Sequence, residues 1–201
     1  MSEAACAVQP LRSYSHRQEI LLRAKHVLTG ALAIALVAIG GPASAAGSGD
    51  TTVTFTVTVG AISITVPTSA GLPAGVPGGT TSGQLGSVTV TDNRALLNAF
   101  WTSTVSSTDY TTGAGTAAET ITKSNVSYWS GPATATTGNG TFTPGQATST
   151  QKQPLTTAIT AFSMTGGNGN NSASWNPTLV VAVPASAVGG LYTGTVTHSV
   201  A

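Results

Sequence analysis

The sequence predicts an all-β protein, an antiparallel Ig-like β-sandwich preceded by a helical signal peptide. Short runs in which apolar residues alternate with Thr or Ser recur through residues 47–201, and a period of two is typical of half-buried strands. Clusters of Gly, Pro and Asn separate these runs, as expected for turns between short antiparallel strands. Thr and Ser are abundant in the same region, and both residue types are poorly suited to helix interiors.

Residues 1–46 have the order of segments found in a secretory signal peptide. A basic region precedes the apolar run at residues 27–41, and the small residues 43–45 supply a cleavage pattern. The apolar run is shorter than the roughly 20 residues that usually span a bilayer, so we expect cleavage and contact with the membrane only during export. The basic region is unusually long, which leaves the start site open. The predicted mature domain, residues 47–201, has no cysteine because Cys6 lies in the removed part.

The alternating runs place the strands in order along the domain. Residues 51–59 and 61–66 each carry apolar side chains on one parity and mainly hydroxyl side chains on the other, which predicts two half-buried strands. Residues 67–86 are rich in Gly and Pro, which predicts a long loop. Residues 94–100 are the one stretch compatible with a helical turn. The same alternation predicts further strands at residues 87–91, 100–105, 125–130, 157–164, 178–184 and 191–200, with a hairpin at 138–140 and a turn at 166–171.

Charge is scarce, and this excludes several classes of function. Only 6% of residues are charged and the formal net charge is +1, against roughly 25% charged residues in a typical domain. This composition argues against a nucleic-acid-binding surface. His198 is the only histidine of residues 47–201, and its parity with neighbouring apolar residues is expected to turn it toward the core or a neighbouring sheet. We identify no catalytic residue, no metal site and no cofactor.

Aromatic residues are the best candidates for recognition. Flat aromatic faces can stack on sugar rings, but tryptophan also fills the core of β-sandwiches. Trp101 alternates in step with Val105, which places it on the inward face. Tyr128 and Trp129 are adjacent, so in a strand one of them points outward. We expect Trp129 to be more exposed than Trp101.

Two segments resemble the WxL-domain surface proteins of Gram-positive bacteria. Residues 88–105, V-T-V-T-D-N-R-A-L-L-N-A-F-W-T-S-T-V, are similar to the family's first signature, where a strand leads to an Asp-x-Arg turn, a short loop and Trp-x-Leu. Residues 179–200 resemble its closing hairpin. Ser103 replaces the leucine of the first motif, and Thr-His-Ser at 197–199 stands where a second Trp-x-Leu would be.

The resemblance implies a secreted, non-enzymatic surface protein that is held noncovalently at the cell wall. Its partner would be peptidoglycan or a wall-bound companion protein, and a freely secreted form is also compatible with the missing second motif. Two alternatives from other classes stay open: a structural subunit of a surface fibre, built by strand addition at Thr-rich edges, and a small secreted hydrolase. The candidate contact residues are Tyr128, Trp129, Trp101, Asp92 and Arg94.

Overall fold

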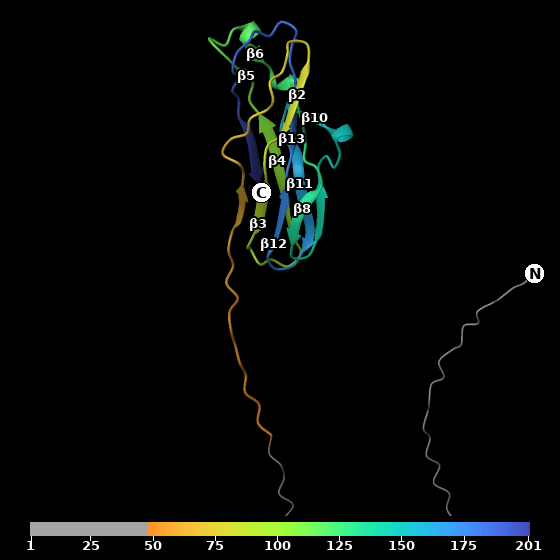
Figure 1. The fold of residues 1–201 in the computed structure, drawn as a ribbon. Helices are drawn as coiled ribbons and strands as arrows, with labels where there is room; N and C mark the ends of the chain where they lie inside the picture. The colour runs from red at the N-terminus through yellow and green to blue at the C-terminus, as the bar shows by residue number, and fades with distance from the viewer. Residues whose placement is uncertain (1–47) are drawn as a thin grey trace, which may run out of the picture. The chain divides into compact units, whose positions relative to one another are not determined.

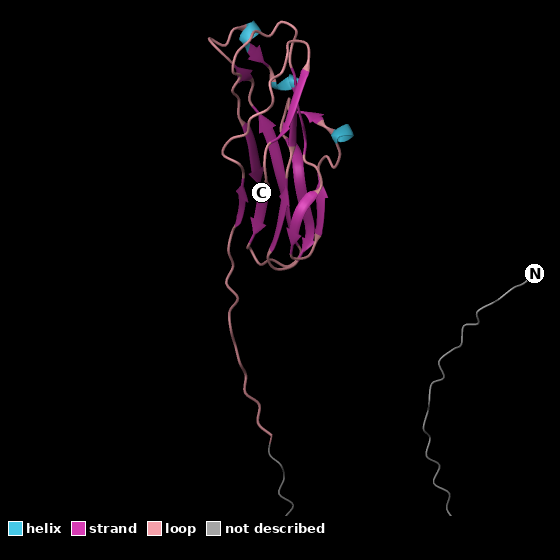
Figure 2. Ribbon diagram, viewed as in Figure 1, coloured by secondary structure: helices cyan, strands magenta, loops and turns pink. Residues whose placement is uncertain are grey.

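The structure is a computed structural model that describes residues 48–201, and the predicted signal peptide lies outside the described residues. Within the described part of the chain, strands dominate and the helical segments are three short 3-10 turns (Figure 2). No helix among these residues is long and apolar enough to cross a membrane. The all-β prediction is confirmed. The 3-10 turns are η1 (Ala117–Glu119), η2 (Lys123–Asn125) and η3 (Ser149–Gln151).

Among residues 48–201, all strand pairs are antiparallel, as predicted, and they form three four-stranded sheets and a two-stranded ribbon (Figure 1). The first sheet has the order β1 (Ile62–Thr65), β3 (Val88–Asp92), β12 (Asn171–Trp175), β8 (Ala133–Thr137). The second has the order β10 (Gln153–Pro154), β7 (Val126–Trp129), β13 (Thr178–Ala182), β2 (Thr80–Gln84). The third has the order β14 (Val196–Val200), β4 (Ala99–Ser107), β11 (Ile159–Gly167), β9 (Thr141–Pro144), and the ribbon joins β5 (Tyr110–Thr111) to β6 (Thr120–Ile121).

The first and second sheets are two halves of one bent surface. Three chain segments run from one half into the other, namely β2 to β3, β7 to β8 and β12 to β13, and they keep the same lateral order in both halves. Residues 85–87, 130–132 and 176–177 form the breaks, where Gly and Pro interrupt the ladder. The interruption is compensated: the Leu85 N–H donates to the Pro177 carbonyl at 2.9 Å.

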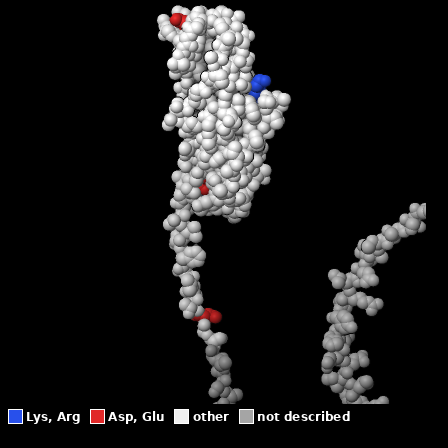
Figure 3. Space-filling model, viewed as in Figure 1, with Lys and Arg blue, Asp and Glu red and all other residues white. Residues whose placement is uncertain are grey.

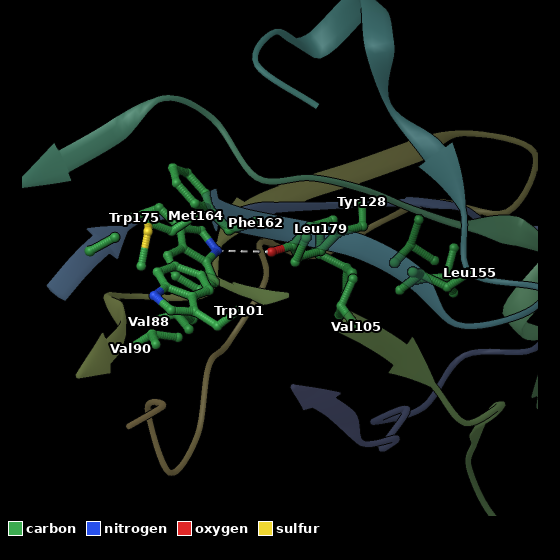
Figure 4. Close-up of a cluster of buried hydrophobic side chains, with 14 of the residues drawn as sticks. Val88, Val90, Trp101, Val105, Tyr128, Leu155, Phe162, Met164, Trp175 and Leu179 are labelled. Carbon is green, nitrogen blue, oxygen red and sulfur yellow. Dashed lines mark hydrogen bonds between the residues drawn. The ribbon is translucent and has the colours of Figure 1, made fainter. Parts of the chain in front are cut away.

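The hydrophobic core includes residues of all three four-stranded sheets, and its large aromatic residues come from the third sheet and the first. Trp101 of β4 and Phe162 of β11 are fully buried with Trp175 of β12 (Figure 4). The rings of Phe162 and Trp175 stack with centroids 4.8 Å apart. Full burial of a large apolar side chain contributes about 1.5–3 kcal/mol, so these three side chains are major contributors to stability. The arrangement is sandwich-like, and the inward placement of Trp101 is confirmed.

The predicted strand over residues 51–59 is wrong. This segment belongs to none of the strands of the described chain, and Val53, Phe55, Val57 and Val59 are 70–86% exposed. The segment is unpaired because β3, the strand that pairs with β1, ends at Asp92. Beyond the bond from the Gly60 N–H to the Asn93 carbonyl (2.7 Å), β3 offers no further residues to pair with.

Other predicted elements differ in ways that pattern alone does not determine. The predicted loop 67–86 contains β2, whose Thr/Gly-rich sequence is held by pairing with β13. Residues 94–100 hold a turn and the start of β4 rather than a helical turn. The turn at 138–140 joins β8 and β9, which lie in different sheets and are not a hairpin. The last strand is shorter than predicted, because residues 191–195 make only an isolated bridge.

Candidate functional site

Four residues form a polar cluster at one end of β3 and β4, which we name the signature cluster: Asp92, Arg94, Trp101 and Asn171. Asp92 ends β3 and is fully buried. Its carboxylate accepts hydrogen bonds from the Arg94 backbone N–H (3.0 Å), Nε (2.8 Å) and Nη2 (2.9 Å). Arg94 also donates to the Phe100 carbonyl at 2.8 Å. A two-residue spacing therefore closes the turn after β3 with an ion pair.

Asn171 connects this ion pair to the buried tryptophan. The Trp101 Nε1–H donates to the Asn171 Oδ1 at 2.9 Å, and the Asn171 Nδ2 donates to the Asp92 Oδ2 at 3.4 Å. Asn171 is the first residue of β12 and lies opposite Asp92 in the ladder. Sequence reasoning missed this residue because it lies 79 positions from Asp92. The available signal was an Asn at the start of a strand, directly after the Gly/Asn turn.

The electrostatics of the cluster keep Asp92 ionised. The side-chain hydrogen bond from Arg94 lowers the pKa of the Asp92 carboxyl and outweighs the desolvation that raises it. The same bond raises the pKa of the Arg94 guanidinium. A buried carboxylate needs this compensation, because an unpaired buried charge is strongly destabilising. The ion pair therefore stabilises the turn that follows β3.

The segment that the cluster holds, residues 94–100, is named the tip loop. Ala95 and Asn98 adopt φ values of 53° and 55°, a left-handed conformation that Asn tolerates but that costs roughly 1–2 kcal/mol at Ala95. The loop nevertheless exposes Leu97 (86%) and Phe100 (70%), with Leu96 partly exposed. A strained backbone that presents apolar side chains to solvent is typical of a contact site.

Neighbouring loops support the tip loop through asparagine side chains. The Asn98 N–H donates to the Asn168 Oδ1 at 2.9 Å, and the Gly169 N–H donates to the Leu96 carbonyl at the same distance. The Asn168 N–H in turn donates to the Asn139 Oδ1 at 2.6 Å. These amide oxygens are occupied by backbone donors. Three loops therefore support one another, and the apolar side chains sit on a rigid base.

Tyr128 and Trp129 lie on β7, in a different sheet from the signature cluster. Tyr128 is fully buried, whereas Trp129 is only partly buried, so Trp129 is the more exposed of the two and is also more exposed than Trp101. Of the five predicted contact residues, the structure brings Asp92, Arg94 and Trp101 together. It places the Tyr128 and Trp129 pair elsewhere.

Tyr128 belongs to a buried chain of polar groups that ends at His198. The Trp175 Nε1–H donates to the Tyr128 hydroxyl at 3.1 Å (Figure 4), which lies 3.1 Å from the His198 Nε2. All three atoms are satisfied when Tyr128 donates to a neutral imidazole. Burial lowers the pKa of His198 to about 4 and raises that of Tyr128. This histidine faces inward, as predicted, and its role in the structure is to pair with Tyr128.

The outer surface carries little charge. On the face shown in Figure 3, acidic and basic side chains are isolated from one another among uncharged ones. Asp92 and Arg94 neutralise each other. Within residues 48–201, no group of three or more His, Cys, Asp or Glu side chains could hold a metal ion. The remaining charged residues of this part are Asp50, Asp109, Glu119, Lys123 and Lys152.

We compared the chain with protein-family models, with curated proteins and with solved structures, and none of the three comparisons found a match.

Proposed function

We propose that this chain is an exported, non-enzymatic surface protein with an Ig-like sandwich that binds a wall-bound companion protein through its tip loop. One observation carries the proposal: a partly buried ion pair holds a strained loop that exposes Leu97 and Phe100. The residues that build this arrangement, Asp92, Arg94 and Trp101, are those that carry the resemblance to WxL-domain proteins. The signal-peptide pattern of residues 1–46 supports export.

The chemistry of the tip loop favours a protein partner. The centres of protein interfaces are apolar and enriched in aromatic residues, and the tip loop offers two leucines and one phenylalanine. Its charged residue, Arg94, is engaged by Asp92. Direct binding to peptidoglycan is the second candidate, and the partly exposed indole of Trp129 supports it, because aromatic faces stack on sugar rings.

The titratable groups support a non-enzymatic function. A general base must be accessible and must lie within hydrogen-bond reach of its substrate. His198 is partly buried, lines the smaller of two hollows and is paired with Tyr128, and burial disfavours its charged form. Asp92 is buried and engaged by Arg94. Both groups therefore have structural partners where a catalyst would need free ones.

The test is wall retention of the full chain in producing cells that are fractionated into wall, membrane and medium. Leu97→Asp should shift the protein from the wall to the medium, with at least about a tenfold loss of retention, because it removes the burial of one large apolar side chain. Val76→Asp is the matched control, since Val76 is also an exposed apolar residue (68%) but lies outside the tip loop. Circular dichroism checks that both variants fold.

A second arm of the experiment identifies the partner. Retention on intact walls but not on protein-stripped peptidoglycan supports a companion protein. Retention on stripped peptidoglycan that Trp129→Ala abolishes supports direct glycan binding and contradicts the role of the tip loop. Retention that neither variant changes contradicts both forms of the proposal.

A further inference from the structure

The segment before β1 has the pattern of a strand but no strand to pair with. We name residues 53–59 the arm. Their apolar side chains alternate with threonines, and none of the seven residues is charged. The apolar ones are Val53 (80% exposed), Phe55 (86%), Val57 (70%) and Val59 (72%). Four large apolar side chains on one face of an extended segment are typical of a strand that covers an apolar surface.

The same chain contains an uncharged groove, lined by both apolar and polar residues, beside the loop that follows β1. It consists of two hollows of about 430 Å³ and 210 Å³, which share the lining residues Ala70, Leu72, Tyr110 and Gly194. None of the described residues that line either hollow is charged. The larger hollow is lined mainly by apolar surface and is suited to apolar side chains, whereas the smaller one is the more polar of the two.

One wall of the groove is formed by residues 191–195, which precede β14 and are hydrogen-bonded along one side only. Thr193 exchanges two backbone hydrogen bonds with Thr111 (2.9 and 3.0 Å). In an extended chain, the backbone groups of the next residues on either side point in the opposite direction. The N–H and C=O groups of Tyr192 and Gly194 make no hydrogen bond among the described residues, so this edge can accept another strand.

We propose that the arm of one copy adds as a strand along residues 191–195 of a second copy, with its Val and Phe side chains in the groove. Strand addition of this kind obtains affinity from backbone bonds and specificity from pockets for alternate side chains. The seven residues of the arm span roughly 23 Å when extended. The threonine face would remain in solvent, where it already lies.

The positions of the arm and the groove favour docking of the arm into the groove of a second copy over docking into the groove of its own chain. The arm precedes the first residue of β1, whereas the groove begins with residues 66–72, after the last residue of β1. Figure 1 shows the arm (orange) leaving the opposite end of β1 from this loop. The Gly60 N–H bond to the Asn93 carbonyl sets that direction. A docked pair leaves one arm and one groove free, so the interface is head-to-tail and further copies can add to it.

The test is sedimentation velocity of the full chain over a range of concentrations. We expect polymers that grow with concentration. Phe55→Asp should weaken self-association by at least about tenfold, because it removes an apolar side chain from the groove. Thr56→Asp is the matched control: it adds the same charge to the same arm on the solvent face and should leave assembly intact. Val188→Asp, which changes a groove residue that is 43% exposed, should be as damaging as Phe55→Asp.

A mixing experiment tests the head-to-tail geometry. Phe55→Asp chains keep a normal groove and Val188→Asp chains keep a normal arm, so an equimolar mixture should form heterodimers that do not extend. A wild-type chain that stays monomeric, equal effects of Phe55→Asp and Thr56→Asp, or closed symmetric dimers would each overturn the proposal. The inference does not depend on the tip loop, since Leu97→Asp should release the protein from the wall and leave polymers unchanged.

Discussion

Replacing Trp101 tests whether the tryptophan of the signature cluster is a core residue. Its side chain is fully buried, and its ring centroid lies 6.4 Å from that of Phe162 and 6.5 Å from that of Phe142. Trp101→Ala removes this packing, and emptying a large aromatic site costs about 3–5 kcal/mol in the free energy of unfolding. Trp101→Phe keeps much of the packing but leaves the Asn171 Oδ1 without its donor, which costs about 1–3 kcal/mol.

Urea unfolding of the full chain, monitored by circular dichroism, measures these differences in the free energy of unfolding. Thermal unfolding, monitored in the same way, measures the melting temperature. One kcal/mol shifts the melting temperature of a domain of this size by about 2–4 °C. Trp101→Ala should therefore lower it by about 6–20 °C. Trp129→Ala is the control on a partly exposed tryptophan and should cost much less.

The ranking of the three variants decides the question. A loss of less than about 1 kcal/mol for Trp101→Ala would refute the core assignment, given the usual cost of such cavities. An equal loss for Trp129→Ala would show that exposure does not separate the two sites. If Trp101→Phe is neutral, the bond to Asn171 contributes nothing to stability and the cluster is held by Asp92 and Arg94 alone.

Two further predictions concern pH and backbone strain. Burial lowers the pKa of His198 from 6.5 to about 4, so the folded state binds fewer protons there than the unfolded state. The contribution of this titration to the free energy of unfolding is complete above pH 6.5, and it should fall by about 3 kcal/mol toward pH 4. Urea unfolding at a series of pH values should show this decrease, and His198→Gln should abolish it. Ala95→Gly should stabilise the protein by about 0.5 kcal/mol, because glycine adopts the left-handed conformation of residue 95 without strain. The larger loss of backbone entropy on folding offsets part of this gain. A lower melting temperature in calorimetry would contradict the prediction.

The parts of the fold that follow from local alternation could be predicted from the sequence. Val88 and Val90 define β3, and Trp101 and Val105 define the inward face of β4. The arm shows the limit of this reasoning. Its alternation is as regular as that of β3. Periodicity shows which face of a strand is apolar, but it does not show whether the fold provides an apolar surface for that face to pack against.

Non-local pairing accounts for what the sequence did not reveal. β2 has no apolar alternation and is a strand because β13 lies beside it. Asp92, Arg94 and Trp101 could be grouped because they lie within ten residues of one another. Asn171 completes their cluster across a ladder, and its position after the Gly/Asn turn does not show which strand it will face. The Gly/Asn turns at 138–140 and 166–171 indicate a reversal of the chain but not the sheet to which it leads.

The scarcity of charge on the outer surface determines how this protein responds to its ionic surroundings. Electrostatic attraction between charged surfaces is screened by salt, with a Debye length of about 8 Å at physiological ionic strength. A surface whose polar groups are mainly hydroxyls has little such attraction to lose, so its contacts should persist from dilute to concentrated media. It also lacks long-range steering, and its association rates should stay near the roughly 10⁵–10⁶ M⁻¹s⁻¹ of unsteered encounters. Contacts of this kind form slowly and are insensitive to changes in external salinity.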